Sequence, residues 1–80
     1  MQTFEQKHNR FMIASQNHDQ ARAAFLKAVE IHQLCSKLYY LSQSEKDRQR
    51  LEQADEESNQ ASEAVDKAID ALTQAMDDLF

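Results

Sequence analysis

The pair His32 and Cys35, in the segment His-Gln-Leu-Cys, has residue types and a spacing that suit metal binding. Residues three apart on a helix share a face, so two copies of this pair across a dimer axis would supply the four ligands that zinc takes. Both residues, however, also belong to a regular seam of the chain. In such a seam a histidine is usually packed, and a free cysteine is an ordinary core residue. His32 and Cys35 are therefore weak candidate ligands, and a metal-binding helical bundle is kept as an alternative.

Other chemistry finds less support in the sequence. Glu5 and His8 have the Glu-x-x-His spacing of carboxylate di-iron bundles, but those need a second such motif and two more inward glutamates. Cys35 lacks a third group to orient a catalytic dyad, and a chain without glycine has no phosphate-cradling loop. We expect no catalytic residue, no cofactor and no small-molecule substrate, so the protein is predicted not to be an enzyme.

The first half of the chain is organised by flat rings that recur every seven residues. The column of rings is Phe4, Phe11, His18, Phe25, His32 and Tyr39. A second column, offset by three and small after its first member, is Lys7, Ala14, Ala21, Ala28, Cys35 and Ser42. A heptad repeat keeps one seam of a helix against a partner helix. The pattern predicts a long helix over about residues 3–41.

The ends of this helix carry capping signals. Thr3 and Gln6 fit a capping box, and Ser42-Gln-Ser-Glu is followed, two residues on, by a near-copy that begins at Ser44. The polar stretch 15–19 could restart a helix at Asn17 or Asp19, but the seam stays in phase through it, which favours a continuous helix. We predict a turn at about residues 42–44.

A second heptad seam follows the turn and predicts a helix over about residues 45–79. Its members are Leu51, Ala54, Ser58, Ala61, Val65, Ala68, Leu72, Ala75 and Leu79. A short connection makes neighbouring helices antiparallel, so residues 32–35 should face about 51–54 and residues 11–14 about 72–75. The fold class is all-α, with residues 1–80 forming a single antiparallel hairpin domain. The absence of glycine and proline agrees with this class.

The first helix also carries large apolar residues outside its seam. The candidate partner-binding residues are Met12, Ile13, Leu26, Val29, Leu34, Tyr40 and Leu41. A helix that is apolar on more than one face is normally covered on more than one face. We therefore predict a protein–protein interaction module, such as a small adaptor, co-chaperone or regulator. Its partner is another protein or a second copy, and a homodimer would complete a four-helix bundle.

The charge distribution bears on other partners. The net charge is −5, with five Lys/Arg against three Asp/Glu in residues 1–43 and four against eleven in residues 44–80. An acidic second half argues against nucleic acid, and the basic residues of the first half are sparse. A dimeric nucleic-acid-binding regulator, using Lys7, Arg10, Arg22, Lys27 and Lys37, remains the other alternative.

Composition also bears on location. No apolar run approaches the roughly 20 residues of a membrane span, and the polar first residues lack the apolar core of a signal peptide. A single cysteine suits a reducing compartment. We therefore expect a cytoplasmic protein without a membrane partner.

Overall fold

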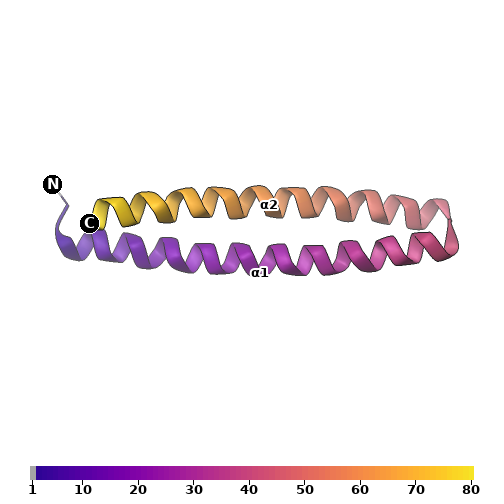
Figure 1. The fold of residues 1–80 in the computed structure, drawn as a ribbon, viewed down its shortest axis with the longest axis horizontal. Helices are drawn as coiled ribbons and strands as arrows, with labels where there is room; N and C mark the ends of the chain where they lie inside the picture. The colour runs from indigo at the N-terminus through magenta and orange to yellow at the C-terminus, as the bar shows by residue number, and fades with distance from the viewer. Residues whose placement is uncertain (1) are drawn as a thin grey trace.

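The computed structural model describes residues 2–80 as two long helices joined by a tight turn (Figure 1). Helix α1 spans Phe4–Ser42 and helix α2 spans Glu45–Leu79. The helices lie side by side and antiparallel, with both ends of the chain at one end of the rod and the turn at the other. The rod measures 59 × 14 × 14 Å. The predicted all-α hairpin is confirmed.

Helix α1 runs unbroken through residues 15–19, as the in-phase seam predicted. Its first turn is closed by the expected capping box. The Gln6 backbone N–H donates to Thr3 Oγ1 at 3.2 Å, and the Thr3 backbone N–H donates to Gln6 Oε1 at 3.0 Å. These two bonds satisfy donors that a helix start otherwise leaves without partners.

The turn is made by Gln43 and Ser44, without glycine. Gln43 has φ 51° and ψ 27°, the left-handed conformation, and its N–H donates to the carbonyl of Tyr39 at 2.8 Å. A residue with a Cβ pays roughly 1–2 kcal/mol for this conformation. Of the two capping boxes in the sequence, the structure selects the later one, because Ser42 is the last residue of α1 and Ser44 is the N-cap of α2.

Asp47 takes part in two hydrogen bonds that stabilise the turn. Its backbone N–H donates to Ser44 Oγ at 3.2 Å, and the Ser42 hydroxyl donates to Asp47 Oδ2 at 2.5 Å. The hydrogen bond from Ser42, helped by Ser44 and the nearby Arg50, holds the pKa of the Asp47 carboxyl below its usual range. The carboxylate also lies in the first turn of α2, where the helix dipole favours negative charge.

We expect the substitution Ser44→Ala to lower the free energy of unfolding by about 1 kcal/mol, because it removes the acceptor for the Asp47 N–H. Urea unfolding followed by circular dichroism would measure the loss. Ser36→Ala, at an exposed position within α1, is the matched control and should not destabilise the protein. Equal midpoints for the two variants would contradict the capping role of Ser44.

The core is a single layer between the two helices. All nine seam residues of α2 are buried or half-buried, and in α1 only the first and last seam positions, Phe4 and Ser42, are exposed. The buried residues are three alanines, Ala14, Ala54 and Ala75, and no large side chain among residues 2–80 is fully buried. Two helices that touch along one seam cover each other on one side only. The hairpin therefore leaves most of its large apolar side chains partly open.

Candidate interaction surface

The hairpin exposes more surface than a compact protein of its mass. Its accessible surface is 6336 Å² for 9.3 kDa. A typical folded monomer of this mass exposes about 5,000 Å², so the excess is about 1,300 Å². Among residues 2–80, twelve large hydrophobic residues are exposed, so apolar side chains contribute to this extra surface. A surface of this kind usually marks a site of association.

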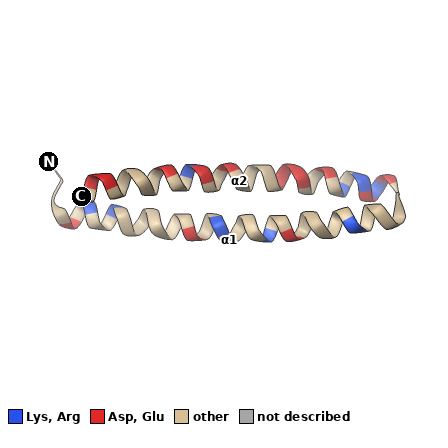
Figure 2. Ribbon diagram, viewed as in Figure 1, with Lys and Arg blue, Asp and Glu red and all other residues tan. Residues whose placement is uncertain are grey.

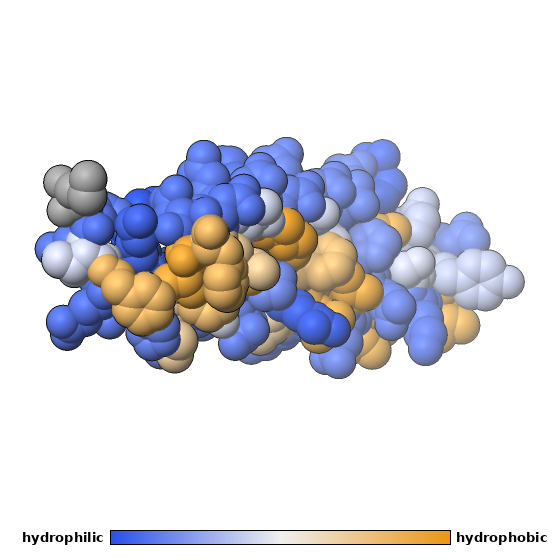
Figure 3. Space-filling view, turned by 60° about the vertical axis from the view of Figure 1, so that its left-hand side comes forward, coloured by the Kyte–Doolittle hydropathy of each residue, from blue (hydrophilic) through white to orange (hydrophobic). Residues whose placement is uncertain are grey.

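Six of the seven predicted partner-binding residues are exposed, and the seventh, Val29, is half-buried. The exposed fraction reaches 60% for Leu34 and 80% for Leu41. All seven lie outside the seam that packs on α2. In Figure 3, apolar side chains gather along the lower side of the rod, where α1 lies, while the α2 side is mostly hydrophilic. The structure thus leaves these residues accessible to a partner.

One long side of the rod can be assigned from contacts between the helices. Arg10 Nη1 donates to Asp78 Oδ2 at 3.1 Å across the two helices. A hollow on the same side is lined by Arg10, Ile13, Ala14, Asn17, Ala71 and Ala75. A second hollow, nearer the turn, is lined by Ile31, Cys35, Arg50, Gln53, Ala54 and Glu57. In heptad terms, these residues are the seam positions and the positions that flank them on one side.

This side carries an apolar stripe on α1 near the turn. Its members, at steps of three, four and three, are Ile31, Leu34, Leu38 and Leu41. The stripe covers about 15 Å of the helix, and all four side chains are exposed. Ile31 and Leu38 were absent from the predicted site, although their spacing relative to Leu34 and Leu41 was visible in the sequence. They were not predicted as part of the site because they lie beside the seam, where a residue is often covered by the partner helix.

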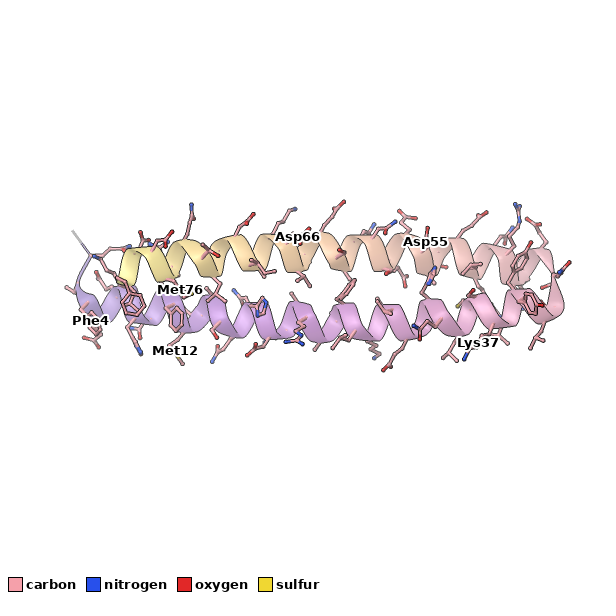
Figure 4. All side chains as sticks on the ribbon, viewed as in Figure 1. Phe4, Met12, Lys37, Asp55, Asp66 and Met76 are labelled. Carbon is pink, nitrogen blue, oxygen red and sulfur yellow. The ribbon has the colours of Figure 1, made fainter. Side chains whose placement is uncertain are left out.

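The opposite long side carries a second apolar set. In α1, the heptad positions on this side of the seam are occupied by Met12, Leu26, Val29 and Tyr40. Helix α2 contributes Ile69 and Met76 to the same side. His32 Nε2 lies 3.4 Å from Asp55 Oδ1 on the same side. Figure 4 shows that Met12 and Met76 lie toward the end of the rod where the chain begins and ends.

The two sides differ in charge. By heptad position, the side with the Ile31–Leu41 stripe, here called the basic face, contains Arg10, Lys27, Lys46, Arg50 and Lys67 against Glu57 and Asp78. By the same assignment the other side, here called the acidic face, contains Glu5, Asp19, Glu45, Glu52, Asp55 and Asp66 against Arg22 and Arg48. In Figure 2 the charged segments of α2 are mostly red, with blue ones mainly near the turn, and the blue segments of α1 are scattered along the helix. Each face therefore combines apolar residues with a net charge of one sign.

Ion pairs within α2 connect side chains at the turn end of the acidic face. Arg48 Nη2 donates to Glu45 Oε1 at 2.6 Å, and its Nη1 lies 3.7 Å from Glu52 Oε1. The hydrogen bond from Arg48 holds the pKa of the Glu45 carboxyl below its usual range, and the pKa of Arg48 is raised in return. All three side chains are solvent-exposed, so these pairs contribute little to stability.

The candidate metal ligands do not form a site within one chain. His32 and Cys35 are half-buried in the seam toward α2, where Cys35 borders a hollow with Arg50 and Ala54. Residues 2–80 contain no group of three or more His, Cys, Asp or Glu side chains arranged to hold a metal ion. His32 approaches Asp55 on the acidic face, whereas Cys35 borders the hollow on the basic face. His8 of the Glu-x-x-His segment is exposed and stacks on Phe4, with ring centroids 6.3 Å apart.

The basic residues considered for nucleic-acid binding do not form a stripe. Lys7 is half-buried in the seam, Arg10 is paired with Asp78, and Arg22 lies on the acidic face. Lys27 lies on the basic face and Lys37 on the outer side of α1, so the five point in different directions. Recognition of a phosphate backbone needs clustered positive charge.

Two further findings concern membrane spans and similarity to known proteins. Within residues 2–80, neither helix has a stretch apolar enough to cross a bilayer. No protein-family model, curated protein or solved structure matches the chain. The candidate surface therefore rests on its own geometry and charge.

Proposed function

We propose that this chain is a non-enzymatic protein–protein interaction module of the adaptor, co-chaperone or regulator type. It associates through the apolar faces of α1. The observation that carries this proposal is the exposed Ile31–Leu41 stripe on a hairpin in which the buried residues among positions 2–80 are three alanines. So small a core contributes little to the stability of the isolated rod. Covering the stripe with a partner buries additional apolar surface and so stabilises the hairpin.

The size of the effect supports the proposal. Full burial of a leucine or isoleucine side chain is worth roughly 1.5–3 kcal/mol, and the stripe offers four that are between 41% and 80% exposed. Part of this gain is offset by the loss of translational and rotational freedom on association. Helix-to-helix packing is the mode that fits, because exposed apolar residues at alternating steps of three and four interlock with those of another helix.

The cytoplasm fits this role. Cys35 is the one cysteine of the chain, and it is half-buried between the helices. It therefore has no partner in its own chain for a disulfide, which suits a reducing compartment.

Sedimentation equilibrium of the purified protein tests the proposal. We expect a mass of at least twice 9.3 kDa at about 100 µM, decreasing on dilution toward about 1 µM, as the burial of a few large apolar side chains predicts. Circular dichroism of the same samples should show helix content and thermal stability falling together with the mass. A fully helical monomer with a melting temperature independent of concentration would contradict the proposal, because its apolar faces would then need no cover.

A further inference from the structure

We propose that the occupant of these apolar faces is a second copy of this chain, and that the basic face of one copy packs on the acidic face of the next. The two copies point in the same direction. This inference rests on the proposed function and specifies its partner. It is drawn from the charges of the two faces, from the level of matching residues along the rod, and from the area that the faces offer.

The charges of the two faces are complementary. The basic face carries five Lys/Arg against two Asp/Glu, and the acidic face carries six Asp/Glu against two Lys/Arg. Two copies that met through the same face would bring like charges together, which disfavours a symmetric dimer. Contact between unlike faces brings Lys46 and Lys67 of one copy toward the acidic residues of its neighbour.

The matching residues occur at the same level along the rod, because they are neighbours in the sequence. Met12 lies on the acidic face and Ile13 on the basic face, about 1.5 Å apart along the helix axis, and Tyr40 and Leu41 repeat this arrangement. The charges follow the same rule in α2. Asp66 lies on the acidic face and Lys67 on the basic face, with Glu45 and Lys46 as a second such pair.

Copies that point the same way therefore bring two apolar pairs and two pairs of opposite charge into contact. Ile13 of one copy meets Met12 of the next, and Leu41 meets Tyr40. Lys67 meets Asp66 in the same register, and Lys46 meets Glu45. When one copy is displaced by close to zero along the rod axis relative to its neighbour, the apolar pairs and the charged pairs are aligned at the same time.

The available area agrees with this arrangement. A long side of the rod measures 59 by 14 Å, about 800 Å², which is about what each partner buries in a standard stable interface. Covering both faces would remove an area comparable to the excess of about 1,300 Å². Because the two contacting faces differ, each added copy presents a free face, so assembly continues into a ring or an open array.

Two charge-reversed variants test the arrangement. The first carries Lys27→Glu, Lys46→Glu and Lys67→Glu, which makes both of its faces acidic. The second carries Asp19→Lys, Glu52→Lys and Asp66→Lys, which makes both of its faces basic. We expect each variant alone to associate at least about 100-fold more weakly than the wild type, because unlike faces no longer exist within one protein. An equimolar mixture should recover assembly, with the two variants in a 1:1 ratio by native mass spectrometry.

The outcomes separate this inference from the proposed function. Circular dichroism of the mixture controls for folding, since variants that are unfolded alone should regain helix content when mixed. If either variant alone retains the wild-type association, or if the mixture fails to assemble, the charge-directed arrangement is wrong, while the proposed function stands as long as the wild type associates. If the wild type is a stable folded monomer, both are wrong.

Discussion

Replacing Ala54 by glutamate is expected to lower the free energy of unfolding by at least about 3 kcal/mol, the scale of an uncompensated buried charge. Ala54 is 4% exposed and belongs to the seam of α2, where it borders the same hollow as Cys35. A carboxylate there would lose hydration, and the neighbouring Arg50 is already paired with Asp47 at 3.4 Å. With so thin a core to offset the loss, we expect most of the helical signal at 25 °C to disappear. Thermal and urea unfolding by circular dichroism measure the effect.

The matched control for this experiment is Ala23→Glu. Ala23 is exposed on the outer side of α1, and the substitution introduces the same side chain into a helix of similar length. Because glutamate and alanine differ little in helix propensity, we expect a change within about 0.5 kcal/mol. Comparable destabilisation at the two positions would show that the seam is not the packed interface of the hairpin.

Replacing Leu34 by glutamate is expected to weaken association by about 100-fold, which corresponds to about 2.7 kcal/mol. Leu34 is 60% exposed in the hairpin and occupies the middle of the Ile31–Leu41 stripe. The change removes the burial of a leucine and requires a carboxylate to be desolvated in the contact. The fold of the single hairpin should tolerate it, since the side chain lies outside the seam. Sedimentation equilibrium gives the shift in the association constant.

Gln16→Glu is the control for Leu34→Glu. It adds the same charge at an exposed position on the outer side of α1, seven residues before Ala23, and removes no apolar surface. We expect the association of this variant to stay within about threefold of the wild type, as for a peripheral charge at an interface. Unchanged association of Leu34→Glu would show that the stripe is not the contact.

The two helices and the sides on which they pack were predictable from the local sequence pattern. A ring every seven residues and an alanine at every second seam position of residues 51–79 specify which sides of two helices meet, because only that register buries both columns. The same patterns predicted an unbroken helix through residues 15–19 and a turn near Ser44. The choice between two capping boxes needed the structure, since Ser42 and Ser44 both have suitable neighbours and only the backbone path shows which one ends α1.

The candidate surface was predictable in part. Met12, Ile13 and Leu34 stand out in the sequence because they break the polar pattern expected opposite a seam. Ile31 and Leu38 did not, since a residue that flanks a seam is covered in some hairpins and open in others. Their exposure here follows from the slenderness of the rod, in which α2 offers only small or polar neighbours such as Ala54 and Gln53.

By itself, the sequence determined the fold class, the seam, the turn and the surplus of apolar residues on α1, because heptad phase and capping are short-range properties of one chain. Tertiary structure alone decided which residues of the two helices share a side. Only after α1 and α2 are paired does Arg10 meet Asp78, and only then do Lys67 and Arg50 of α2 join Lys27 of α1 on one face. Residues far apart in the chain add their charges only when packing places them together, and that sum divides this rod into a basic face and an acidic one.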